Sequence, residues 1–334
     1  MNSTPTLLRD SAPVYAGVDL GGTSIHAAAV RQGHVLSEIG AKTPRDASPA
    51  DVLGLIADLV EELRDGLGRD APLQGVCVGA PGAVDSEAGV VRNAPNLGWS
   101  NVRVARDLSG LLQLPVVVEN DVTIGAIGEH RYGAGRGSSS LVAIFVGTGV
   151  GGAILLDGTP VRGFRGAAGE LGHLIAVPDG RICGCGRAGC FEAYASRTAM
   201  EEILMERVRE GRPSVVPGIM QEKEKTRMSS SVVEAALDEG DPLMTEVLAE
   251  VQSHLASLVA NVVNTLDPEV VVFGGGLVAR LGDRFVDPIA REARRGFLQQ
   301  EGAEEIRVVP GTLGDQAGTI GAAGVAAERL AEVG

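Results

Sequence analysis

The sequence has no basic cluster, no long apolar run and few aromatic residues, and these absences narrow the class of protein. The formal net charge is −14, which argues against nucleic acid as a partner because binding a phosphate backbone requires a basic face. No apolar run reaches membrane-spanning length, and residues 1–13 lack the basic start and apolar core of a signal peptide. We therefore expect a cytoplasmic protein without a membrane or nucleic-acid partner.

Cysteine is also scarce, and its placement is informative. Of the 4 cysteines, three are crowded together at Cys183, Cys185 and Cys190, with His173 upstream of them. A disulfide is a poor explanation, because Cys183 and Cys185 are too close to pair comfortably and three is an odd number. One imidazole and three thiolates make the Cys3His set of a structural zinc site, which leaves no position for a catalytic water.

The alternative is that these residues are free cytosolic thiols in a glycine-rich turn. The glycines at 184, 186 and 189 favour the metal site, because a tight knuckle must turn its backbone around the ion. The remaining Cys77 lies in an apolar run and is expected to be a small buried core residue.

Length and composition indicate an α/β protein of two domains or one large unit. The chain has 334 residues, 47 glycines and 3% aromatics, which suits many tight loops between strands and helices. Patterning predicts strands at 14–20, 24–30, 73–78, 115–119, 140–146 and 269–273, and helices at 51–64, 122–131, 201–209, 242–266 and 317–331. Residues 211–231 are expected to form an exposed loop. Two strand-turn-strand openings, near Asp19 and Phe145, indicate a duplicated core.

Three glycine turns follow predicted strands. They are Gly21-Gly22-Thr23, the turn that begins Gly147-Thr148-Gly149, and Gly274-Gly275-Gly276. Such turns bring backbone N–H groups close to an anion, and together with Asp19 they outline a nucleotide site. The spacing is neither the dinucleotide-binding pattern nor a P-loop.

Acidic residues near these turns are candidates for the chemistry. Asn120 and Asp121 lie at a strand-to-helix junction, where Asp121 either caps the helix or acts as the base that takes a proton from an alcohol during phosphoryl transfer. Glu170 and Glu192 flank the cysteine segment, and are either surface acids or rigid acceptors for a polyol. Trp99 is expected to be a hydrophobic plug.

From about residue 14 to about residue 330, the chain resembles the ROK (repressor, open reading frame, kinase) sugar kinases, and among them the bacterial glucokinases. The resemblance is carried by Glu170-x-x-His173, by Cys183-x-Cys185-Gly-x-x-Gly-Cys190-x-Glu192 and by the Asp19-Leu-Gly-Gly-Thr23 turn, which the wider actin-like and hexokinase superfamily shares. It implies a two-domain actin-like, hexokinase-like (ribonuclease H-like) α/β fold with a cleft between domains. We place the smaller domain at 1–122 plus a helix at about 317–334, and the larger at 123–316.

The resemblance also implies roles for single residues. Asp121 would be the catalytic base, and the sugar would contact Asn120, Asp121, Glu170, His173 and Glu192. Asp19 would lie near Mg²⁺, and Gly21, Gly22, Thr23, Gly147, Thr148 and Gly149 would hold the phosphates of ATP. Gly274, Gly275 and Gly276 would lie against the adenosine. His173, Cys183, Cys185 and Cys190 would bind zinc.

The expected reaction is the ATP-dependent phosphorylation of a hexose at its 6-hydroxyl, with glucose as the expected substrate. Alternatives are N-acetylmannosamine, N-acetylglucosamine, fructose or allose, and, from another class, a non-catalytic sugar-sensing regulator. The residues before the first turn are too few for the DNA-binding domain of the repressor members. The resemblance favours a homodimer or a homotetramer.

Overall fold

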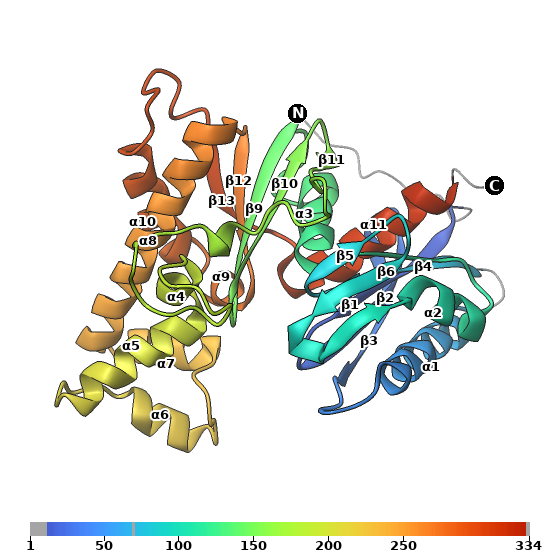
Figure 1. Cartoon of the computed structure of the whole chain (residues 1–334), viewed down its shortest axis with the longest axis horizontal. Helices are drawn as coiled ribbons and strands as arrows, with labels where there is room; N and C mark the ends of the chain where they lie inside the picture. Colours follow the sequence, from blue (N-terminus) through green and yellow to red (C-terminus); the bar gives the residue numbers. More distant parts are fainter. Residues whose placement is uncertain (1–11, 69–70, 332–334) are drawn as a thin grey trace, which may run out of the picture. The chain divides into compact units, whose positions relative to one another are not determined.

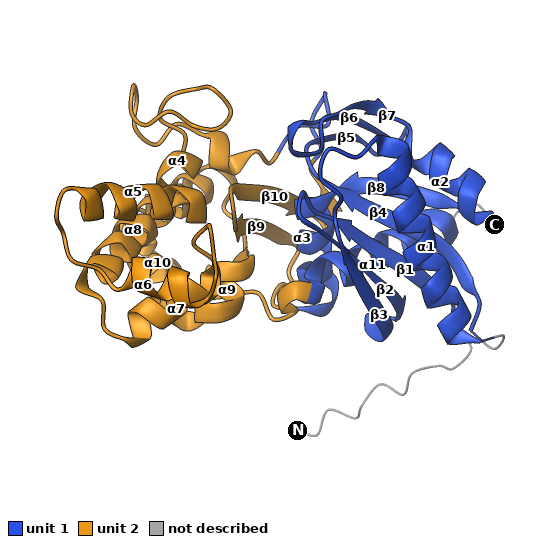
Figure 2. Ribbon diagram, turned by 90° about the horizontal axis from the view of Figure 1, so that it is seen from below, with its two compact units in different colours: residues 1–133, 162–168, 316–334 blue, residues 134–161, 169–315 orange. Residues whose placement is uncertain are grey.

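The computed structural model describes residues 12–68 and 71–331, which form two compact units. Unit 1 comprises residues 1–133, 162–168 and 316–334, and unit 2 comprises residues 134–161 and 169–315, as coloured in Figure 2. Most of the leader at 1–13 falls outside the described residues. The division into two domains after residue 122, expected from the sequence, stays a prediction. In the described part of the chain, no helix is both long and apolar enough to cross a membrane.

Unit 1 is built on a five-stranded sheet of order β3-β2-β1-β4-β8; Figure 1 labels β1 to β4 of this sheet, and Figure 2 labels all of its strands. β1 and β2 are antiparallel, whereas β1, β4 and β8 are parallel. The strands are β1 (Val14–Leu20), β2 (Ser24–Arg31), β3 (His34–Lys42), β4 (Leu73–Ala80) and β8 (Val116–Asn120), with a smaller sheet of β5 (Ala83–Asp85), β6 (Val90–Ala94) and β7 (Trp99–Val102). β1 and β4 are buried along almost their whole length, which explains their continuous apolar sequences.

The helices of unit 1 are α1 (Pro49–Leu67), α2 (Val104–Leu112), α3 (Asp121–Tyr132) and α11 (Ala317–Ala331), with short 3₁₀ turns at Pro95–Leu97 and Gly314–Gln316. α1 begins at a capping box, in which the Ser48 side chain accepts from the Asp51 backbone N–H and Asp51 accepts from that of Ser48. Trp99 and Cys77 are both buried, which confirms the plug and the core cysteine.

Unit 2 repeats the strand order of unit 1. Its five-stranded sheet has the order β11-β10-β9-β12-β13, again with the first pair antiparallel and the later strands parallel to β9. The strands are β9 (Ser140–Val146), β10 (Val150–Leu156), β11 (Thr159–Pro160), β12 (Val270–Gly274) and β13 (Arg307–Pro310). The matching order confirms the duplicated core that the two strand-turn-strand openings indicated.

The helices of unit 2 bury a hydrophobic core around α8. They are α4 (Glu192–Ala195), α5 (Arg197–Arg209), α6 (Val216–Glu222), α7 (Ser230–Asp238), α8 (Pro242–Leu266), α9 (Gly276–Leu281) and α10 (Asp283–Arg294), with a 3₁₀ turn at Leu171–His173. The bounds predicted for α8 and α11 are confirmed, whereas α5 begins at Arg197 and not at residue 201.

The exposed loop predicted for residues 211–231 was wrong in part: residues 221–227 are exposed as expected, but the segment contains a helix. α6 lies inside it and buries Val216 and Ile219, one helical turn apart, in the core of unit 2. Of the two prolines in this segment, Pro217 is in the first turn of α6, where its missing N–H costs no hydrogen bond. Ahead of it, the buried Asp241 carboxylate accepts hydrogen bonds from Ser214 and from the Val215 backbone.

α11 packs against both β1 and α3 by close approach of backbone to backbone. A Cβ atom added at Gly321 would lie 1.8 Å from the Ile124 carbonyl oxygen of α3, and one at Gly17 of β1 would lie 1.9 Å from the Thr319 carbonyl oxygen. Both positions therefore require glycine, because a side chain would overlap a neighbouring backbone. In α11, glycine lowers the intrinsic helix propensity relative to alanine.

We predict that Gly321→Ala destabilises the protein by roughly 2–3 kcal/mol, because overfilling a packed interface displaces backbone. Gly54→Ala in α1 is the matched control, since nothing lies within 4 Å of its added Cβ, and it should stabilise by about 0.5–1 kcal/mol. Urea unfolding of both variants measures the difference. Equal stability of the two variants would contradict the close packing of α11.

Candidate functional site

In unit 1, two carboxyl groups lie at the ends of parallel strands. Asp19 is near the end of β1, and Asp121 begins α3 directly after β8. Asp19 is half-buried as a residue, and the protein surrounds its carboxyl group. Burial, and to a smaller extent the negative charge of Asp121, raises the pKa of Asp19 to about 7. Two such carboxyls favour either a shared proton or a cation close to both.

The carboxylate of Asp121 is held in a fixed direction by its neighbours. Its Oδ1 accepts hydrogen bonds from the Asn120 Nδ2 and from the Val122 backbone N–H, both at 2.9 Å. Asn120 caps the helix, because its Oδ1 accepts from the Thr123 backbone N–H at 3.0 Å. The alternative that Asp121 is merely the cap of α3 is therefore wrong.

Asn120 is itself satisfied within unit 1. Besides capping α3, its Nδ2 donates to the Gly82 carbonyl at 3.2 Å, and its Oδ1 also receives the Thr123 hydroxyl at 3.3 Å. A ligand that bonds to Asn120 would have to replace one of these contacts. In this structure, the Asn120 side chain caps α3 and orients the Asp121 carboxylate.

Glu119, which sequence reasoning passed over, supports this junction from below. It is 2% exposed, and its Oε1 accepts from the Ser86 hydroxyl at 2.8 Å and from the Asn120 backbone N–H at 3.0 Å. Its Oε2 accepts both Nε and Nη2 of Arg162, at 3.1 and 2.6 Å. Both Arg162 bonds reach this single oxygen, and the ion pair offsets the buried charge of Glu119. The sequence held one signal, an acid at the end of an apolar strand.

The first glycine turn, Gly21 to Thr23, joins β1 to β2 and is open to solvent at Gly22 and Thr23. The Gly21 N–H donates to the Ser24 carbonyl at 2.9 Å, and the Thr43 hydroxyl donates to the Gly21 carbonyl at 2.7 Å. The turn is therefore fixed from both sides next to Asp19.

In unit 2, the second and third glycine turns come together. Gly147 to Gly149 follows β9, Gly274 to Gly276 follows β12, and these strands are parallel neighbours. A Cβ atom at Gly275 would lie 2.5 Å from the Val146 carbonyl oxygen, and one at Gly274 would lie 2.6 Å from the Phe145 ring. The two turns thus line one edge of the sheet, where α/β proteins bind nucleotides.

The four predicted zinc ligands also come together in unit 2. The ligand atoms of His173, Cys183, Cys185 and Cys190 all lie within 4.8 Å of one another. His173 Nδ1 is 3.7 Å from the Cys183 sulfur, and the sulfurs of Cys185 and Cys190 are 3.7 Å apart. A tetrahedral zinc with bonds of about 2.3 Å to sulfur requires edges of about 3.8 Å. All the thiols are free, so the cluster is compatible with structural zinc.

The thiols of the cluster differ in acidity. The Arg187 backbone N–H bonds to the Cys185 sulfur and lowers the pKa of Cys185 to about 6, whereas burial raises the pKa values of Cys183 and Cys190. A cation would remove the protons from the two buried thiols, because thiolates are the form that binds metal.

The two flanking acids have different surroundings. Glu170 is exposed and precedes the 3₁₀ turn that carries His173. Glu192 is partly buried at the start of α4, where its Oε2 accepts from the Val150 backbone N–H at 3.0 Å and its Oε1 lies 3.4 Å from the Cys183 sulfur. Glu192 therefore links the cysteine cluster to the turn between β9 and β10.

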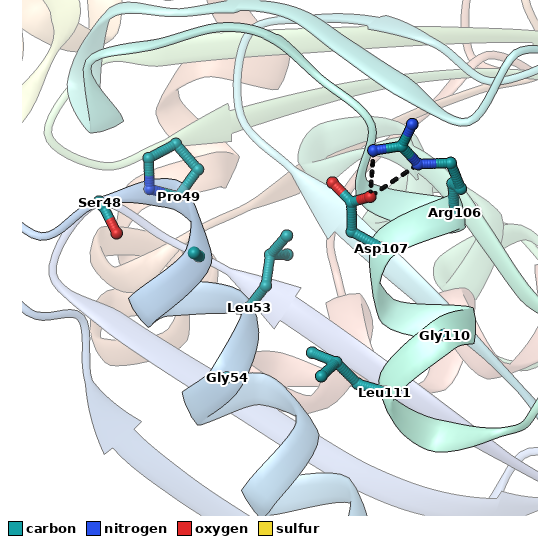
Figure 3. A pocket seen from close by; sticks show the side chains of 9 residues that line it. Ser48, Pro49, Leu53, Gly54, Arg106, Asp107, Gly110 and Leu111 are labelled. Carbon is teal, nitrogen blue, oxygen red and sulfur yellow. Dashed lines mark hydrogen bonds and ion pairs between the residues drawn. The ribbon is translucent and has the colours of Figure 1, made fainter.

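A pocket of about 690 Å³ lies elsewhere, between α1 and α2 of unit 1 (Figure 3). Leu53 and Leu111 line it, together with the ion pair of Arg106 and Asp107. Its lining includes none of the predicted site residues. We do not count it as part of the candidate site.

Comparison with known proteins gives a consistent result. The ROK family model matches residues 15–329. The chain is 35% identical to the glucokinase of Halalkalibacterium halodurans, over 92% of this chain and 93% of that protein. It is 34% identical to the glucokinase of Thermotoga maritima, over 94% and 97%.

A solved structure is also similar. It is a ROK family glucokinase from Streptomyces griseus in complex with glucose and AMPPNP, with a TM-score of 0.83, 32% identity and coverage of 93% of this chain and 98% of that one. The fold expected from the sequence is therefore confirmed. With a family model that spans nearly all of its length and relatives above 30% identity along that same span, the chain belongs to the ROK family.

Proposed function

We propose that this protein is an ATP-dependent sugar kinase that phosphorylates glucose at its 6-hydroxyl. The observation that carries the proposal is the fixed Asp121 carboxylate at the end of β8, in a chain similar over nearly its whole length to glucokinases. One of these relatives was solved with glucose and AMPPNP.

The reaction requires one base and a phosphate site. The oxygen of the 6-hydroxyl would attack the γ-phosphorus of ATP, the bond from that phosphorus to the β–γ bridging oxygen would break, and the hydroxyl proton would pass to the Asp121 carboxylate. The products are ADP and glucose 6-phosphate. Because Asn120 and the Val122 N–H both bind Oδ1 of Asp121, the carboxylate needs no reorientation during the step.

The surroundings of Asp19 support a cation beside the phosphates. At neutral pH, its raised pKa leaves Asp19 only partly ionised next to Asp121, and a divalent cation would favour ionisation of both. Asp19 with the Gly21 to Thr23 turn would hold magnesium and phosphate, and magnesium neutralises phosphate charge when it is bound. The turns at Gly147 and Gly274 would receive the remaining phosphates and the adenosine.

Residues in and beside the metal loop, the segment from His173 to Cys190 that carries the four predicted zinc ligands, would bind the sugar. His173 directs Nδ1 at the Cys183 sulfur, so with this nitrogen on zinc its Nε2 would donate to a sugar hydroxyl. Glu170 and Glu192 would accept from hydroxyls, and Asn120 would do so by exchanging one of its present bonds. Zinc would supply a rigid anchor for the loop and no chemistry, since His173, Cys183, Cys185 and Cys190 would fill all four of its positions.

Three further expectations belong to this proposal. The free thiols suit a cytoplasmic location, where cysteines stay reduced. The domains divide near residue 122, with α11 joining the first. The active form is a homodimer or a homotetramer, which light scattering of the purified protein would determine.

With magnesium and ATP, the purified protein should phosphorylate glucose faster than N-acetylmannosamine, N-acetylglucosamine, fructose or allose. Asp121→Asn should lower kcat by about 10²-fold or more, because general-base catalysis contributes that much, and should leave the KM for glucose nearly unchanged. A coupled assay of ADP formation measures both quantities.

The control is Asp58→Asn, an exposed carboxyl on α1, which should keep full activity. Failure of the wild type on every hexose and amino sugar would refute the kinase. Substantial turnover by Asp121→Asn would refute the base assignment alone.

Metal analysis should find about one zinc per chain. Cys190→Ala should lose the zinc and, at temperatures where the variant is still folded, raise the KM for glucose roughly tenfold, because His173 loses its fixed direction. Cys77→Ala, which removes a buried cysteine outside the cluster, should keep the metal. Zinc-free protein with an unchanged KM would contradict this structuring role.

The free protein should become less stable as pH rises from about 4 to about 7. The raised pKa of Asp19, about 7 against an ordinary 3.8, means that the folded state keeps this proton when the unfolded state has lost it. Asp19→Asn removes the effect, so relative to wild type it should be more stable at pH 8 than at pH 5 in urea unfolding. A gap that is equal at both pH values would contradict the buried, proton-binding Asp19.

A further inference from the structure

The second glycine turn is tied to the start of α5. The Arg197 backbone N–H donates to the Gly147 carbonyl at 2.9 Å, and the Thr198 hydroxyl donates to the Thr148 carbonyl at 2.8 Å. Ser196 caps the helix, because its hydroxyl accepts from the Ala199 N–H at 3.0 Å. Any ligand held by Gly147 to Gly149 therefore lies beside the first residues of α5.

One side chain of this helix end reaches the turn itself. The Arg197 Nη2 donates to the Thr148 hydroxyl at 3.0 Å. The side chain is partly buried, and burial lowers the pKa of Arg197. Within residues 12–68 and 71–331, Arg197 forms no ion pair, and the guanidinium has five N–H donors. A partly desolvated cation thus sits at the turn with donors to spare.

The acid that would ordinarily neutralise Arg197 is already engaged. Glu201, one turn further along α5, is paired with Arg227 at 2.9 Å, and only 13% of its side chain is exposed. The charge of Arg227 also acts on Arg197 and lowers its pKa. Glu201 therefore bonds to Arg227 and not to Arg197, and Glu202 is a second acid near Arg227. Of these two arginines, Arg197 is the one without an ion-pair partner among the described residues.

The third glycine turn adjoins the same place. Gly275 lies against the Val146 carbonyl, and an added Cβ at Gly276 would lie 3.1 Å from the Ser230 hydroxyl. Arg227 precedes Ser230 by only three residues. The second and third turns and Arg197 therefore belong to one region of unit 2, in which the guanidinium of Arg197 suits an anion and not a neutral sugar.

We propose that Arg197 binds phosphate oxygens of the nucleotide held at the Gly147 to Gly149 turn. Its planar fork matches two oxygens of a phosphate, and a charge-assisted bond in a partly buried place is strong. The Thr148 hydroxyl fixes the guanidinium before the ligand arrives, which limits the entropy lost on binding. This assignment rests on the proposed ATP-dependent kinase and adds to it a residue outside the glycine turns.

The test compares Arg197→Gln and Arg197→Lys with a control, Arg209→Gln, at the other end of α5, where the side chain donates to the Met205 carbonyl. Arg197→Gln should raise the KM for ATP roughly tenfold or more, as loss of a charged hydrogen bond does, with the KM for glucose within about twofold. Arg197→Lys should recover part of the loss, because it keeps the charge. Arg209→Gln should match wild type.

Calorimetry separates a phosphate contact from a merely structural one. Arg197→Gln should weaken binding of ADP and of AMPPNP while the affinity for adenosine stays at the wild-type value. An equal loss for adenosine, or an unchanged KM for ATP in Arg197→Gln, would overturn the assignment although the wild type still phosphorylates sugar. A wild type that binds no nucleotide would instead refute the kinase, and with it the assignment.

Discussion

The close approach of α11 to β1 and α3 is the constraint on which unit 1 depends. Gly17 and Gly321 let the helix backbone touch its neighbours directly, and Gly318, in the first turn of α11, leaves room for the Asp19 carboxylate, whose Oδ2 would lie 2.5 Å from an added Cβ. The same contact encloses Asp19, so that burial raises its pKa. Packing and electrostatics at this end of the sheet therefore have one cause, the absence of a side chain at Gly318 and Gly321 of α11.

In unit 2, Glu192 has the corresponding position between two elements. Its carboxylate joins the Val150 N–H to the neighbourhood of Cys183, and the space it occupies requires glycine at 149, where an added Cβ would lie 2.3 Å from Oε2. The metal loop and the turn after β9 are thus fixed by one side chain. A shift in either element would therefore change the contacts of Glu192 with the other element.

Much of this arrangement could be read from the sequence where the signal is local. The bounds of α8 and α11, the turn after β1 and the set of His173 with three cysteines are each written in one short segment, and the structure agrees with them. The buried pair of Glu119 with Arg162 could not be read, since its members are far apart in the sequence and meet only through the fold. The same holds for Arg197, whose contact with Thr148 depends on where α5 begins.

The helix α6 was missed for a related reason. Its first turn carries a proline, and it is short and followed by a run of charges, so local propensity favoured a loop, while the burial of Val216 and Ile219 comes only from tertiary packing. The sequence predicts this helix at 201–209, whereas α5 begins at Arg197. The Ser196 cap is the local signal that marks the earlier start.

The path of the chain has a consequence for its synthesis. Unit 1 takes its strands from the beginning of the chain and α11 from the far end, with all but a short piece of the sequence between them belonging to unit 2. The ribosome synthesises α11 after every other described helix. The five-stranded sheet of unit 1 therefore lacks α11 until the whole of unit 2 has been translated. A nascent chain that stalls late would leave β1 and α3 without the helix they pack on, an apolar surface of the kind that chaperones bind.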